Sequence, residues 1–167
     1  VTTGGAEGAT DTASGTIAHN STAAVGFTNT YSNNVTINPE GQKTLDGRNL
    51  TAGDAYGFTL TPDDAAAAAI ADGSITVADS YNTASVTGDG TGKTADFIFG
   101  DITFKTAGSY TFTITENLPQ GVSADSPAAD GIKYDTHSAV VTVTVAADET
   151  TGLLSADVVY SNTGAPF

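Results

Sequence analysis

Apolar and polar residues alternate along most of this chain, which is the pattern of half-buried β-strands. Tyr56, Phe58 and Leu60 share one face of the segment DAYGFTL. Val141, Val143 and Val145 share one face of HSAVVTVTVAAD. Further strands are predicted at VTINPEGQKTL, which has a Pro-Gly interruption, and at SITVADS, ADFIFG, DITF, YTFTITEN and LLSADVVYS. Short strands separated by frequent turns predict an all-β sandwich or barrel.

One segment, TPDDAAAAAIADG, has a helical composition instead. Thr61 can cap a helix, Pro62 suits the first helical position, and the two aspartates favour the positive end of the helix dipole. The alanines propagate a helix and Gly73 can end it. The sequence therefore predicts one short helix over residues 62–72.

The N-terminal part of the chain differs from the rest. Residues 1–24 are small and polar, with few apolar groups to anchor them to a core. The segment VGFTNTY, residues 25–31, then has a short strand pattern. The length of 167 residues suits about one domain. We therefore expect an N-terminal segment over residues 1–31 and one domain over residues 32–167.

Charge and cysteine content exclude several classes of protein. The net charge is −14, from 19 acidic and 5 basic residues, which disfavours nucleic acid and anionic lipid as partners. No apolar run is long enough to span a bilayer and no signal peptide is present, so we expect a mature or excised extracellular chain. The chain has no cysteine, so such a domain needs another source of stability.

The sequence predicts no cofactor and no metal site. His19 and His137 are far apart and lack ligand spacing, so they are interpreted as surface or turn residues. The TGDGTGKT stretch is one residue short of a phosphate-binding loop and is interpreted as a hairpin turn. No GxSxG motif is present. Loop acids without calcium-site spacing are interpreted as solvated; these are Asp89, Asp125, Asp130 and Asp135.

Two charged residues lie within strongly patterned strands. Lys43 lies in QKTLDGRNL, beside a strand that should pack inward, and Glu116 ends the strand YTFTITE. From the pattern alone, both could be ordinary exposed groups. Only four glutamates occur in the chain, and this one closes its most regular strand.

Several segments together resemble the Gram-positive, streptococcal-type pilin isopeptide-linkage domain, a repeat of surface pili and adhesins. They are KTLDGRNLTAGDAYGFTL, FGDITFKTAGSYTFTITE, GIKYDTHSAVVTVTV, GLLSADVVY and FTNTY, within residues 25–167. The resemblance implies an immunoglobulin-like or CnaB-like β-sandwich. It also implies an autocatalytic bond between Lys43 and the asparagine of FTNTY, Asn29, with Glu116 as the proton shuttle.

The position of FTNTY departs from the family pattern. The asparagine strand should follow LLSADVVY, but the only FTNTY precedes Lys43. Three arrangements follow. Asn29 completes a preceding repeat, it is donated to a neighbouring subunit, or it pairs with Lys43 of its own chain. Only 13 residues separate the two, and a parallel return generally needs a dozen or more, so the third arrangement is the least favoured.

The resemblance thus implies a structural subunit or repeat of an extracellular pilus or adhesin fibre. Its partners would be neighbouring copies or repeats of the same protein, bonded head to tail by strand donation, with a host surface ligand as a further candidate partner. Beyond a single-turnover self-crosslink, no enzyme activity is expected. The alternative is an adhesin domain that binds host glycan or protein, but the aromatic residues lie on alternating strand faces, as a core requires.

Overall fold

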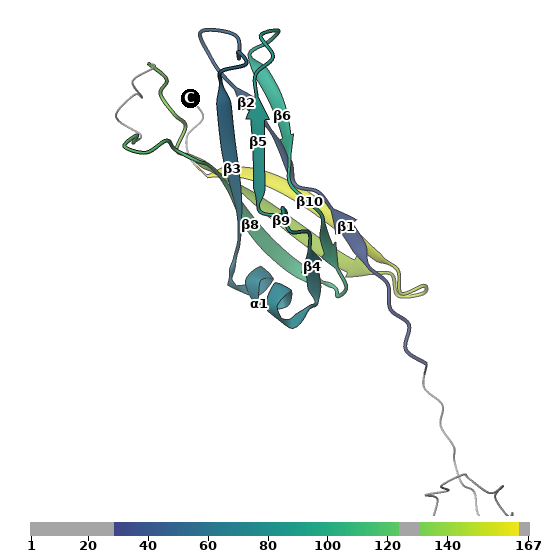
Figure 1. Ribbon diagram of the computed structural model, residues 1–167. Helices are drawn as coiled ribbons and strands as arrows, with labels where there is room; N and C mark the ends of the chain where they lie inside the picture. Colours follow the sequence, from purple (N-terminus) through teal and green to yellow (C-terminus); the bar gives the residue numbers. More distant parts are fainter. Residues whose placement is uncertain (1–28, 124–130, 164–167) are drawn as a thin grey trace, which may run out of the picture. The chain divides into compact units, whose positions relative to one another are not determined.

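The computed structural model describes residues 29–123 and 131–163. The chain divides into two units, Val1–Thr30 and Tyr31–Phe167. All described strands and the single described helix belong to the second unit (Figure 1). No helix in the described ranges is long and apolar enough to cross a membrane.

The largest sheet has five antiparallel strands, and β8 lies at its centre. β8 pairs with β3 on one side and with β9 on the other. The order across the sheet is β10 (Leu154–Thr163), β9 (Ser138–Ala147), β8 (Gly108–Glu116), β3 (Ala55–Pro62) and β5 (Thr83–Thr87). Threonine recurs along β8 and β9, and valine along β9, and such β-branched residues fit a pleated, half-buried surface.

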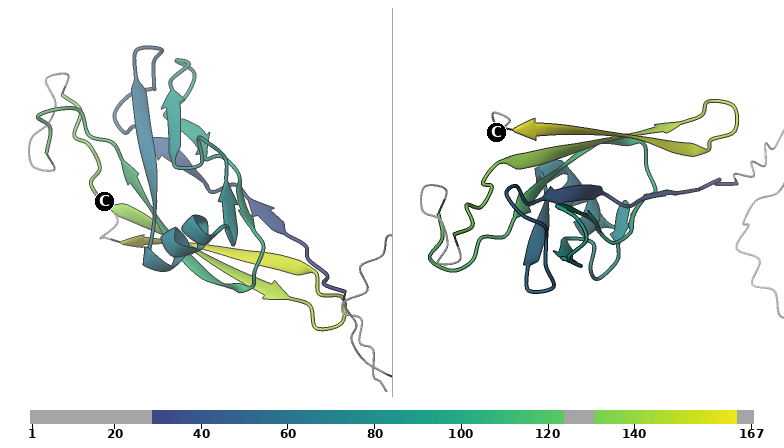
Figure 2. Two further views of the ribbon diagram at one scale, coloured as in Figure 1. Left: turned by 60° about the horizontal axis from the view of Figure 1, so that its bottom comes forward. Right: turned by 90° about the horizontal axis from the view of Figure 1, so that it is seen from above.

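Two smaller sheets complete the described strands. One has the order β1 (Val35–Ile37), β7 (Ile102–Phe104) and β4 (Ile75–Val77). The other pairs β2 (Glu40–Thr44) with β6 (Thr94–Ile98). The view from above in Figure 2 separates the green and yellow β9 and β10 from the blue layer that contains β1. The all-β sandwich expected from the sequence is confirmed.

The core lies between these layers and contains the predicted strand faces. Tyr56, Phe58 and Leu60 of β3 are buried, as are the alternate valines of β9. Phe104 and Phe112 are completely buried. Burying side chains of this size contributes about 1.5–3 kcal/mol each, which makes this alternation the main source of stability.

The helix begins two residues later than the sequence predicts. Helix α1 spans Asp64–Asp72, and its N-cap is Asp63, whose side chain accepts a hydrogen bond of 2.8 Å from the Ala66 N–H. Pro62 is instead the last residue of β3. Aspartate caps a helix at least as well as threonine does, so the later residue takes this role. The predicted end is confirmed, because Gly73 adopts a left-handed conformation with φ of 82°.

The described strands differ from the expected ones, or leave them untested, at three points. VTINPEGQKTL forms two strands, β1 and β2, because Pro39 between them lacks an N–H group. The sequence predicted a turn before ADFIFG but not β5, in which Val86 is the one fully buried side chain. Residues 25–28 of VGFTNTY lie outside the described residues, and 29–31 are not in a strand.

A glycine in β2 brings this strand close to the aromatic core. A Cβ atom at Gly41 would lie 2.4 Å from the ring of Phe97, and that ring stacks on Phe58 at 3.8 Å between centroids. The ring of Phe97 therefore lies directly against the β2 backbone. This contact holds β2 at a fixed distance from β3.

We predict that Gly41→Ala destabilises the fold by about 1–3 kcal/mol, because the added methyl group displaces the Phe97 ring. The matched control is Gly92→Ala, whose new Cβ would approach no atom closer than 3.9 Å. Urea unfolding of both variants provides the measurement. Equal losses of stability would contradict the close contact.

Candidate functional site

Lys43 and Glu116 come from different sheets and meet in the interior. Lys43 lies on β2 and points inward, and Glu116 ends β8. The Nζ atom of Lys43 lies 2.8 Å from each carboxylate oxygen of Glu116. The two side chains are only 10% and 6% exposed, respectively. The structure thus brings together two of the three residues that the resemblance implicates.

The surroundings of this pair act on its protonation. Burial raises the pKa of the Glu116 carboxyl above its usual range, although the hydrogen bond and charge of Lys43 oppose the shift. Nζ of Lys43 also lies 4.5 Å from the centre of the Tyr56 ring. A buried carboxyl with a raised pKa can take a proton from a neighbouring ammonium group. The pair can therefore supply a neutral amine beside a carboxylic acid.

An open groove of about 1220 Å³ leads to the pair. Its lining includes Lys43, Glu116 and the apolar side chains of Phe58, Phe97 and Ile114. β2 lies along the groove, and Tyr160 and Asn162 of β10 also line it. Within the described residues β2 pairs only with β6 and β10 only with β9. Each of these two strands therefore has one edge without a strand partner there.

A hydrogen bond crosses the groove from β2 to β10. The backbone N–H of Glu40 donates to the hydroxyl oxygen of Tyr160 at 3.1 Å. A side chain, rather than a backbone carbonyl, satisfies this N–H group, so β2 and β10 are not paired at this point. An extended chain that entered the groove would find backbone donors and acceptors along both edges.

Comparison with models of known protein families shows to which family the chain belongs. The model of the Spy0128-like isopeptide-containing domain, FctA, matches residues 39–167. The chain belongs to this family. The FctA family is one of pilin-like structural domains from the surface pili of Gram-positive bacteria. A comparison with curated protein sequences found no match.

The segment before β9, within the FctA match, forms one wall of the groove. Ile132 and Tyr134 are buried, and the Tyr134 ring lies 5.9 Å from that of Tyr56. Asp135 and His137 lie further along, with 2.5 Å between a carboxylate oxygen and Nδ1. The resemblance covered this segment, but the sequence interpretation treated Asp135 as a solvated acid and His137 as a surface or turn residue. Both line the groove that leads to Lys43.

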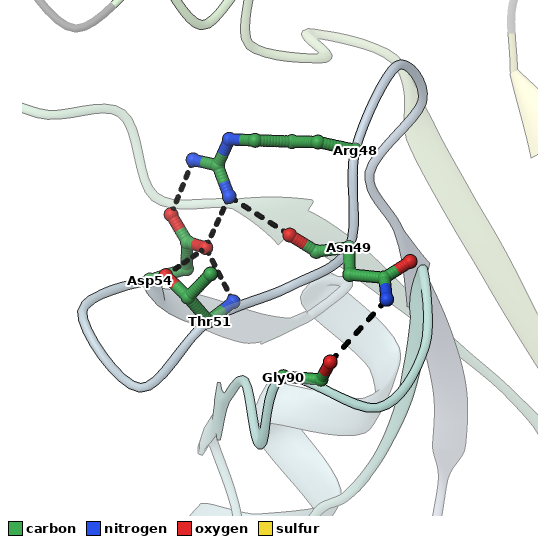
Figure 3. A network of polar contacts seen from close by, with 5 residues as sticks. All are labelled: Arg48, Asn49, Thr51, Asp54 and Gly90. Carbon is green, nitrogen blue, oxygen red and sulfur yellow. Dashed lines mark hydrogen bonds and ion pairs between the residues drawn. The ribbon is translucent and has the colours of Figure 1, made fainter.

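A second polar network anchors the loop between β2 and β3 (Figure 3). Arg48 donates to both carboxylate oxygens of Asp54, at 2.6 and 2.8 Å. The backbone N–H of Thr51 donates to the same carboxylate at 2.7 Å. Asn49 donates to the carbonyl oxygen of Gly90 at 3.3 Å, which ties the loop to the neighbouring turn. The network therefore fixes the chain that connects Lys43 to Tyr56.

The structure does not bring Asn29, the third residue that the resemblance implicates, to Lys43 within the described second unit. Asn29 is exposed and belongs to the first unit, so its pairing with Lys43 stays a prediction. Asn162 of β10 lines the groove, and the sequence interpretation missed it. The only sequence signal for Asn162 was its position two residues after Tyr160 in the last strand. No cluster of possible metal ligands occurs in the described residues.

The network around Asp54 makes the stability of the fold depend on pH. The Arg48 guanidinium lowers the pKa of Asp54 well below its usual range, and the Thr51 backbone hydrogen bond adds to this effect. The folded state thus binds fewer protons than the unfolded state, and the stabilisation is lost as pH falls. We predict that Asp54→Asn lowers stability at neutral pH and that the difference from the native protein narrows below about pH 4.

Urea unfolding across this pH range measures the difference. Asp157→Asn removes a carboxylate from an exposed position of β10 and should change stability little. A difference between native and Asp54→Asn protein that stayed constant with pH would show that the carboxylate charge is unimportant.

Proposed function

We propose that this chain is a structural unit of an extracellular Gram-positive fibre and forms a covalent bond between Lys43 and an asparagine. The observation that supports this function best is the buried Lys43–Glu116 pair beside a groove with two strand edges that have no partner among the described residues. The groove suits one extended segment, whose backbone would pair with β2 and β10. An asparagine side chain that points inward from this segment would reach the pair.

The proposed bond is formed by acyl transfer from nitrogen to nitrogen. Lys43 passes one proton to Glu116 and attacks the carboxamide carbon as a neutral amine. Protonated Glu116 donates a hydrogen bond to the carboxamide oxygen, on which negative charge develops. A new C–N bond forms and the bond to the original NH₂ group breaks. One of the three ammonium protons stays in the new amide, one leaves with ammonia, and one remains on Glu116.

Position rather than an external enzyme would drive this step. A groove that holds amine, acid and carboxamide together provides a high effective concentration. The product amide is consumed by no later step, so each site reacts once. The chain is therefore a self-crosslinking structural protein rather than an enzyme with turnover.

The proposed donor segment is VGFTNTY, with Asn29 as the reacting residue. Phe27, Asn29 and Tyr31 would share one face of this strand, which offers two aromatic side chains to the apolar part of the groove. The short connection to Lys43 disfavours insertion into the same unit. Asn29 would therefore bond to Lys43 of a neighbouring copy or repeat, and the bond would link units head to tail.

We expect each bond to lower the intact mass by about 17 Da, the mass of the expelled ammonia. Lys43→Ala and Glu116→Ala proteins should keep their full mass, because one lacks the nucleophile and the other the acid. Mass spectrometry of the native protein and both variants measures this. Bonds between copies should also leave multimers that survive boiling in detergent, and Lys43→Ala should abolish them.

Peptide mapping would identify the bonded asparagine. We expect Lys43 linked to Asn29 and loss of the link in Asn29→Ala, whereas Asn162→Ala, which removes the groove asparagine of β10, should leave the link intact. A native protein of full mass that dissociates completely into monomers would refute the proposed function. A Lys43–Asn162 link would keep the chemistry but refute the donor strand.

A further inference from the structure

The groove contains a second acid–base pair, Asp135 and His137, which has no role in the bond-forming steps described above. Asp135 and His137 form an ion pair at 2.5 Å when the imidazole is protonated, and their side chains are 30% and 35% exposed. The backbone N–H of His137 also donates to Asp135 at 3.0 Å. These two contacts hold the imidazole in place while solvent still reaches it.

Strand register places His137 beside Glu116. β8 and β9 are antiparallel, and their last pair is Thr115 opposite Ser138. His137 immediately precedes β9, so one further step along the same register would place it opposite Glu116. Residues directly opposite on antiparallel strands have Cβ atoms about 4.5–5.5 Å apart and point to the same face. Both residues line the groove, which agrees with this placement.

Charges from several elements meet at this point. The charged and titratable groups along the groove are Glu40, Lys43, Asp46 and Arg48 from β2 and the loop after it, Glu116 from β8, Lys133, Tyr134, Asp135 and His137 from the segment before β9, and Tyr160 from β10. Three of them act electrostatically on Glu116. Lys43 lowers its pKa, Asp135 raises it, and protonated His137 lowers it.

We propose that the Asp135–His137 pair sets the protonation state of Glu116 and makes isopeptide formation faster as His137 loses its charge. This inference rests on the proposed function. Protonated His137 neutralises Asp135 and favours the Glu116 carboxylate, which cannot donate to the carboxamide. Neutral His137 leaves the Asp135 charge uncompensated, which favours the Glu116 carboxylic acid, the form that can donate to the carboxamide.

The pair is thus a positioning and tuning device, not a group that touches the reacting atoms. Imidazole side chains change charge between about pH 5 and 8. Crosslinking would therefore be slow in mildly acidic surroundings and faster at neutral or higher pH. A change of one pKa unit at Glu116 alters its ratio of acid to carboxylate about tenfold.

The rate is measured with the full chain carrying Asn29→Ala and an excess of the synthetic peptide VGFTNTY. Covalent adduct is followed by mass spectrometry from about pH 5.5 to about pH 8. In this background, we expect the rate of adduct formation to rise about tenfold across this pH range. Adding His137→Gln should abolish the pH dependence and keep the high rate, because glutamine resembles neutral histidine in charge.

Asp135→Asn should lower the rate at about pH 8, since it removes the charge that favours the carboxylic acid. The control is Asp157→Asn, which makes the same change in charge at an exposed position of β10. It should leave the pH profile unchanged. A profile that is the same with histidine or glutamine at position 137 would overturn the inference and leave the proposed function intact.

A second measurement does not depend on bond formation. Carbon NMR of the Glu116 carboxyl group, in the Asn29→Ala chain without peptide, reports its titration directly. We expect His137→Gln to remove the part of that titration that follows the imidazole. If no adduct forms but this coupling is present, the proposed function fails and the electrostatic link stands. If the Glu116 signal is the same with and without His137, the link itself is refuted.

Discussion

The contact between Lys43 and Glu116 is the interaction on which the rest of the site depends. Two opposite charges are removed from water there, and this cost is several kcal/mol per ion unless the geometry compensates. Both carboxylate oxygens contact Nζ at 2.8 Å, and the Tyr56 ring faces the ammonium group. This geometry requires β2 and β8 to keep a fixed separation. The Gly41–Phe97 contact and the loop network around Asp54 both contribute to it.

Burial gives the same contact its potential for chemistry. In water, a lysine would stay protonated and a glutamate ionised at neutral pH. In the interior, the charged and neutral forms of the pair come closer in free energy, because burial penalises charge. The groove then determines which group can reach the Lys43 amine. A pair of this kind without an open groove would be only a structural ion pair, and an open groove without the pair would be only an incomplete sheet.

Alternation along the chain was sufficient to predict the sandwich, because Tyr56, Phe58, Leu60 and the valines of β9 mark one face unambiguously. It was not sufficient for β5, where a single valine is fully buried and packing rather than pattern decides the strand. Lys43 and Glu116 could be singled out only through a family resemblance. Asp135, His137 and Asn162 could not be placed, because their approach to Glu116 or to the groove depends on how β8, β9 and β10 are paired.

The hydrogen bond between Glu40 and Tyr160 has a consequence for the lifetime of an unbonded unit. Exposed strand edges tend to pair with any available chain, which leads to aggregation. A single hydrogen bond contributes only about 0.5–1.5 kcal/mol to stability, so Tyr160 covers this part of β2 without binding it tightly. A strand that pairs with both edges forms several backbone hydrogen bonds and displaces the tyrosine easily. In the proposed strand donation, Tyr160 would thus be a temporary cover of this edge, which discourages weak, unspecific pairing and is displaced by a complete strand.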